Sequence, residues 1–277
     1  MLKQRVITAL VLVAALLSAL AWSPLAFAGL LTLGFSLAQA EWLRLSGWSF
    51  RTSLLVALTL GLAQFVLFAA APTAVAAVAP ATVAAATAIW IGLGVLLLRS
   101  EKKGVVRIPA ATSHVLAIVL PSAAWSALMT FLQLGAIMLL SVLVIVWLAD
   151  IAAYFFGRAF GRRKLAPHIS PGKTWAGVWG AVGGVVVVAL IAWIAFPDAP
   201  LFTRRLLEGF GIPVAAVALS LLVGISIIGD LAESLLKRQA NAKDSSDLLP
   251  GHGGFFDRLD SMFSLLPAAA LLWTWAK

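Results

Sequence analysis

The residues best suited to chemistry lie near the C-terminal end of the chain. Residues 243–260 read KDSSDLLPGHGGFFDRLD, and Asp230 and Glu233 stand just upstream. Carboxylates at this density suit a hard cation such as Mg²⁺. Glycines let backbone N–H groups approach an anion closely, and the start of a following helix would add its positive dipole end. The combination favours a site for a metal ion and a phosphate over an ordinary solvated loop.

Helical spacing would align the first part of this stretch. If residues 229–238 continue a helix, then Asp230, Glu233, Ser234 and Lys237 lie on one face, because positions three, four and seven residues apart are neighbours. Taken alone, the segment also fits a plain helix end in which Glu233 pairs with Lys237. The acids and glycines downstream shift the balance toward a metal and phosphate site.

A second polar segment, residues 157–174, supplies positive charge. Its cations are Arg158, Arg162, Arg163, Lys164 and Lys173. Basic segments beside a membrane often bind only anionic lipid. If these cations faced the carboxylates, they would equally suit a nucleoside triphosphate or a lipid phosphate. Residues 172–174 read GKT, like the end of a P-loop. The first glycine of that motif would stand at residue 167, which is proline, so the motif is excluded.

Composition places both polar segments in a membrane protein. The chain has 277 residues, of which 62% are hydrophobic and 11% charged, whereas soluble domains carry about 25% charged residues. Apolar stretches of about 20 residues recur along its length, enough to span a bilayer as helices. There is no cysteine, which excludes disulfides and thiolate metal sites. The net charge of +9 suits an anionic membrane face and does not require nucleic acid.

We therefore expect an all-α, polytopic membrane protein with about nine transmembrane helices and a cytoplasmic N-terminus. Most Lys and Arg residues then fall on one side, as the positive-inside rule requires, and loops 157–174 and 230–261 both face the cytoplasm. Residues 1–110 would form a lipid-facing scaffold and 111–277 the catalytic region. The expected spans are residues 6–22, 24–40, 53–71, 74–98, 113–131, 134–156, 175–196, 211–229 and 262–276.

Two long motifs resemble those of the phosphatidate cytidylyltransferases, also called CDP-diacylglycerol synthases. The resemblance covers roughly residues 140–262. The upstream motif consists of Trp147, Asp150, Tyr154, Gly161, Lys164, Pro167, Ser170, Pro171, Lys173 and Thr174. The downstream motif consists of Ser234, Lys237, Arg238, Lys243, Asp244, Pro250, His252, Gly253, Gly254, Asp257, Arg258 and Asp260. Two positions depart from the family pattern: Ala176 stands where a glutamate is usual, and Phe255-Phe256 replaces an aliphatic pair.

The resemblance implies transfer of CMP from CTP to phosphatidate, giving CDP-diacylglycerol and pyrophosphate. Mg²⁺ is the expected cofactor, with room for a second cation, and CTP and membrane phosphatidate are the expected partners. A homodimer is left open. Asp230 and Asp257 become the expected principal metal ligands, with Glu233 and Asp260 as further candidates. The other expected catalytic residues are Lys237, Lys243, Asp244 and Arg258, and the expected binding residues are Lys173, Ser170, Arg238, Ser234, Ser245, Ser246, Gly253, Gly254 and His252.

Other functions stay open at this stage. The same chemistry could act on an isoprenoid lipid phosphate, because tail selection would depend on apolar helix surfaces. A cation-coupled transporter would place acids near the bilayer midplane, and the expected spans carry almost no charge. A non-catalytic member of the family is suggested only by Ala176. Glu41 and His114 are isolated in the sequence and receive no role.

Overall fold

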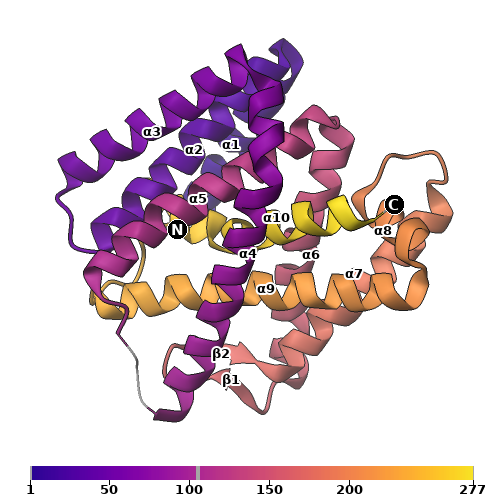
Figure 1. The fold of residues 1–277 in the computed structure, drawn as a ribbon. Helices are drawn as coiled ribbons and strands as arrows, with labels where there is room; N and C mark the ends of the chain where they lie inside the picture. The colour runs from indigo at the N-terminus through magenta and orange to yellow at the C-terminus, as the bar shows by residue number, and fades with distance from the viewer. Residues whose placement is uncertain (1, 104–106, 277) are drawn as a thin grey trace.

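The computed structural model describes residues 2–103 and 107–276 and is almost entirely helical (Figure 1). One antiparallel hairpin pairs β1 (Lys164–Ala166) with β2 (Ser170–Thr174). The helices are α1 (Leu2–Trp22), α2 (Pro24–Leu45), α3 (Phe50–Ala70), α4 (Pro72–Lys103), α5 (Ala110–Gln133), α6 (Ala136–Phe160), α7 (Trp175–Ala195), α8 (Phe202–Phe210), α9 (Ile212–Gln239) and α10 (Phe256–Trp275).

The expected fold class, an all-α polytopic membrane protein, is confirmed, and each of the nine expected spans falls on a helix. Among the described residues, seven helices are long and apolar enough to cross a bilayer: α2 to α7 and α9. The apolar part of α1, Val6–Trp22, is shorter than these. α10 opens with the charged residues Asp257, Arg258 and Asp260 and is buried along most of its length. The count of nine spans is therefore not established.

Two elements of the fold, α8 and the β1–β2 hairpin, were not expected from the sequence. α8 carries Arg204, Arg205 and Glu208 on one side and buries Phe202 and Leu206 on the other, so it is too polar to stand out as a span. The hairpin lies inside the segment 157–174, which we expected to be a loop. Thr174 ends β2 and caps α7, because its Oγ1 accepts a hydrogen bond from the Gly177 N–H at 3.2 Å.

α10 lies at the centre of the packing. It runs beside α9, and α4 crosses both helices (Figure 1). The indole N–H of Trp90 on α4 donates to the carbonyl of Phe263 on α10 at 3.0 Å. The ring of Phe256, also on α10, stacks on Trp42 of α2 with centroids 5.0 Å apart. Helices from both halves of the chain thus fix where α10 begins, and the polar stretch found in the sequence is located there.

α6 and α7 pack closely through small residues. A Cβ added at Gly180 of α7 would overlap the Phe156 side chain of α6, and one at Gly184 would lie 3.0 Å from the Ala152 Cβ. Gly183, between them, has open space around it. Small residues that admit a neighbouring backbone are typical of helix contacts in membranes.

We predict that Gly180→Ala destabilises the protein, because the added methyl group must displace Phe156. Overpacking of this kind costs about 1–3 kcal/mol. Gly183→Ala is the matched control and should leave the unfolding temperature equal or higher, since alanine is the better helix former by about 1 kcal/mol. Thermal unfolding in detergent, followed by tryptophan fluorescence, measures both. Equal unfolding temperatures for the two variants would contradict the packing described above.

Candidate active site where α9 and α10 meet

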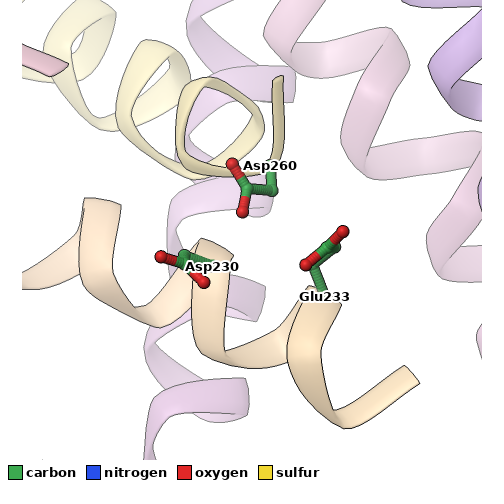
Figure 2. A group of neighbouring side chains, drawn as sticks. All are labelled: Asp230, Glu233 and Asp260. Atoms are coloured by element: carbon green, nitrogen blue, oxygen red, sulfur yellow. The ribbon is translucent and has the colours of Figure 1, made fainter. Parts of the chain in front are cut away.

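Three acids from α9 and α10 form the centre of the candidate site. One carboxylate oxygen from each of Asp230, Glu233 and Asp260 lies within 4.8 Å of the others. Figure 2 shows Asp260 on α10 pointing toward Asp230 and Glu233, which occupy successive turns of α9. Helical spacing puts the α9 pair on one face, and the neighbouring course of α10 brings in the third acid. We call these residues the acid trio.

Glu233 carries the clearest sign that the trio is built for a cation. Its side chain is only 2% exposed, and its Oε2 accepts from the Lys237 ammonium at 2.7 Å. Its Oε1 is buried and has no hydrogen-bond partner among the described residues. A buried oxygen left unpaired in this way is costly, whereas a hard cation accepts oxygen ligands of this kind. The residues present therefore fit a divalent ion.

Asp260 has the electrostatics of an acid that needs a positive partner. Burial raises the pKa of its carboxyl well above the usual value, and the nearby charge of Asp230 raises it further. The Ser261 N–H, which donates to Oδ1 at 2.6 Å, and Lys173 act in the opposite direction. A cation bound at the trio would favour the charged form of Asp260.

Asp257 differs from the trio because protein donors already surround its carboxylate. Oδ1 accepts from Lys237 Nζ at 2.7 Å. Oδ2 accepts from the Ser245 N–H, the Ser245 hydroxyl and the Gly254 N–H at 2.7–2.8 Å. Burial disfavours the ionised form of Asp257 and by itself would raise its pKa. Hydrogen bonding with the Glu233 carboxyl and with these donors outweighs burial and holds the pKa of Asp257 below its usual range. In this structure Asp257 anchors the loop that precedes α10.

Lys237 joins the two groups of acids. Its Nζ lies 2.7 Å from Glu233 Oε2 and 2.7 Å from Asp257 Oδ1, so one ammonium ties α9 to the first turn of α10. The sequence alone allowed an ordinary Glu233–Lys237 pair at a helix end. The pair is present, and the additional contact with Asp257 makes it part of the site.

Glu41, which the sequence analysis left without a role, holds the same loop from the opposite side. It belongs to α2, is 4% exposed, and accepts four hydrogen bonds. Oε2 binds the Ser245 hydroxyl at 2.8 Å and the Phe256 N–H at 2.7 Å. Oε1 binds the Ser246 hydroxyl at 2.5 Å and the Phe255 N–H at 3.2 Å. The sequence signal that could have identified it was a single acid directly after the expected span 24–40.

A polar cavity of about 480 Å³ opens beside the acid trio. Lys173 of β2 lines it and forms an ion pair with Asp230. β1 contributes Lys164, and the pairing of Lys164 with Thr174 sets the hairpin so that both lysines reach the cavity. The other charged residues in its wall are Asp150 and Arg158 of α6. Cations and carboxylates thus meet in one cavity, as a bound phosphate and its counter-ion require.

Several expected catalytic and binding residues lie elsewhere. Lys243, Asp244, Ser245 and Ser246 line a second polar cavity of about 390 Å³, together with Arg44 of α2. Ser245 Oγ also bonds Asp257, so it lies between the acids and this second cavity. Ser234 is close to the trio, its hydroxyl 3.5 Å from Asp230 Oδ1.

The remaining expected cations and glycines bind backbone groups or pack closely against carboxylates. Arg238 Nε donates to the Ile169 carbonyl at 3.4 Å, which ties α9 to the hairpin that carries Ser170. Arg258 Nε donates to the His252 carbonyl at 3.1 Å. Gly253 has a positive φ of 81°, and an added Cβ would lie 2.8 Å from Asp257 Oδ2. The loop is glycine-rich here because two buried carboxylates, Asp257 and Glu41, pack against its backbone.

A family model described as the cytidylyltransferase family matches residues 3–275. A phosphatidate cytidylyltransferase of Pseudomonas aeruginosa is 38% identical over 281 residues, covering 99% of this chain and 97% of that protein. The protein of the same name from Haemophilus influenzae is 49% identical over 133 residues, covering 48% of this chain and 44% of its own length. One from Bacillus subtilis is 38% identical over 137 residues, covering 49% and 46%.

We predict that Glu41→Gln loosens the loop between α9 and α10. A glutamine would turn an NH₂ group toward donors that now bind an oxygen, and an unsatisfied buried polar group costs about 1–3 kcal/mol. Limited trypsin digestion should then cleave after Lys243 roughly tenfold faster than in the parent, because local opening becomes more frequent.

The matched control for that experiment is Glu208→Gln. Glu208 lies on α8, is half-exposed, and pairs with Arg204 at 2.6 Å. An exposed pair of this kind is worth less than about 1 kcal/mol, so the rate of cleavage after Lys243 should not change. If Glu41→Gln were also cleaved at the parental rate, Glu41 would not hold the loop.

Proposed function

The chain belongs to the cytidylyltransferase family, and on that premise we propose that it transfers CMP from CTP to phosphatidate, giving CDP-diacylglycerol and pyrophosphate. The observation that carries the proposal is the acid trio with the unpartnered Glu233 oxygen, beside a cavity lined by Lys173. The names of the relatives supply the substrate class. The location of the site at the end of a membrane-spanning helix suits a substrate that stays in the bilayer.

In the proposed reaction an oxygen of the phosphatidate phosphate attacks the α-phosphorus of CTP. A new P–O bond forms there, and the bond to the bridging oxygen of the β-phosphate breaks, so that pyrophosphate departs with its electron pair. No protein nucleophile is required. The task of the protein is to bring two anions together in line and to offset their repulsion.

The acid trio is the proposed binding place for Mg²⁺, with a second cation allowed. Asp230, Glu233 and Asp260 would supply the oxygen ligands that this ion prefers. When bound, such an ion offsets phosphate charge and stabilises the leaving pyrophosphate. Asp257 stays a candidate ligand from the family resemblance, but its four donors support a role in holding the loop and Lys237.

The cations of the polar cavity are the proposed phosphate ligands. Lys173 is held at the cavity wall by Asp230, and Lys164 and Arg158 stand nearby. Ammonium and guanidinium groups bind phosphate through charge-assisted hydrogen bonds. The second polar cavity, around Arg44 and Lys243, offers further donors for CTP from the far side of the loop. Both cavities then face the cytoplasm, where CTP is available.

We predict that Asp260→Asn and Asp257→Asn fail in different ways. Asp260→Asn should raise the Mg²⁺ concentration needed for half-maximal activity by more than about 100-fold, since even outer partners of metal ligands are worth 10–100-fold. Asp257→Asn should lower kcat and the unfolding temperature while changing the Mg²⁺ requirement little. The assay measures CDP-diacylglycerol from labelled CTP and phosphatidate over a Mg²⁺ series, with a chelator blank.

Asp198→Asn is the control for that assay, because Asp198 is exposed in the turn between α7 and α8. It should behave as the parent. A Mg²⁺ requirement raised equally in Asp257→Asn would restore Asp257 as a principal ligand. Turnover of an isoprenoid phosphate but not of phosphatidate would replace the proposed acceptor.

The proposed orientation can be tested because the chain has no cysteine of its own. Asp247 lies between α9 and α10 and Asp198 between α7 and α8, and both are exposed. A membrane-impermeant maleimide should label Asp198→Cys in intact bacterial cells. Asp247→Cys should react only after the cells are lysed. The reverse pattern would place the site on the outer face.

A further inference from the structure

We infer that an apolar groove between α4, α7 and α9 holds an acyl chain of the lipid phosphate, so that chain and phosphate occupy two joined compartments. This inference rests on the proposed function. The groove has a volume of about 570 Å³, and residues of the β1–β2 hairpin line one side of it. Its wall contains no charged side chain. The hydroxyl of Ser220 lies in the wall and is bonded to its own helix, at 2.7 Å from the Ala216 carbonyl.

The groove adjoins the polar cavity beside the acid trio. Leu165, Val178 and Ile227 line both spaces. Leu165 follows Lys164 in β1, and Ile227 lies one turn before Asp230 in α9. The boundary between the two spaces thus changes from apolar to charged within a few residues on both elements. An amphiphile with an anionic end and a long hydrocarbon chain matches this change of chemistry.

The side of the groove opens where a membrane lipid could enter. Ile91, Val95 and Leu98 of α4 and Leu221 of α9 line it and are 46–64% exposed. Both helices have the length and composition of membrane spans. An apolar opening between two such helices faces hydrocarbon, so a lipid chain can enter sideways without crossing water.

Apolar character alone does not select this groove. Another apolar cavity, of about 290 Å³, lies between α6, α7 and α8 around Val144 and Val188. It shares no lining residue with the polar cavity. Of these two apolar spaces between described residues, the groove under the hairpin is the one that adjoins a compartment able to hold the phosphate of the same molecule. This adjacency favours the acyl chain as its occupant.

Gly224 is a position at which substitutions can fill the groove. It lines the groove from α9, and a Cβ added there would meet no atom within 4 Å. Gly94, across the groove on α4, is different, because an added Cβ would lie 2.6 Å from Ile228 Cδ1. The methyl group of an alanine at position 224 therefore occupies open space without displacing the protein, and larger side chains at this position extend the substitution step by step.

The test measures kcat/KM for a long-chain phosphatidate, with dioleoyl chains, and for a short-chain one, with dioctanoyl chains. The variants are Gly224→Ala, Gly224→Val and Gly224→Leu. The ratio of long-chain to short-chain kcat/KM should fall progressively along the series. For Gly224→Leu it should fall about tenfold, the loss expected when roughly two methylene groups are no longer buried. The graded series keeps the test valid if the leucine variant folds poorly.

Gly183→Leu is the matched control, because Gly183 is also a membrane-helix glycine with open space around it and lines neither the groove nor the polar cavity. Its ratio should equal that of the parent. A ratio unchanged across the Gly224 series would overturn the groove assignment. So would an equal loss with both lipids accompanied by a change in oligomeric state, which would make the groove an interface between copies. If the parent forms no product with either lipid, the proposed function itself fails.

Discussion

A buried carboxylate must find donors or a cation, because unpaired charge in an apolar interior costs several kcal/mol. This constraint organises the end of the α9–α10 pair that carries the acid trio. Glu41 and Asp257 bind the loop from both sides through backbone N–H groups and side-chain donors. The Ser245 hydroxyl, which has one proton to donate, lies within hydrogen-bond distance of both carboxylates. Lys237 then connects Asp257 to Glu233. The loop conformation, the start of α10 and the position of the acid trio all depend on these bonds.

The hydrogen bonds of Glu41 make α2, an N-terminal helix, part of the site. A division near residue 110 describes the chain as a scaffold followed by a catalytic region, yet Glu41 of α2 contacts the loop directly, and Trp42 stacks on Phe256. The aromatic pair Phe255-Phe256, which departs from the family pattern, also fits here. Its two N–H groups bind Glu41, and the Phe256 ring fills the space against Trp42.

What the sequence could predict depended on local periodicity and on long motifs. Spacing along one helix correctly placed Asp230, Glu233 and Lys237 on a common face, because helix geometry alone determines that relation. It could not show that Asp260 would complete the trio while Asp257 faced the loop, since that depends on how α10 is rotated against α9. Nor could it connect Glu41 to Ser245, a contact between residues 204 positions apart. Apolar periodicity identified the long helices but not the polar α8 or the short hairpin.

One helix, α9, carries both the floor of the groove at Gly224 and the first acid at Asp230. Asp230 follows Gly224 by six positions in the helix, so the two lie about 9 Å apart along the axis, whatever the surrounding lipid. A bilayer that thickens or thins changes the tilt of a spanning helix and leaves its internal spacing intact. The distance between the groove and the acids is therefore set by the geometry of α9. Membrane thickness changes the depth at which a lipid headgroup lies relative to the acids. The distance between the polar cavity and the apolar groove does not change.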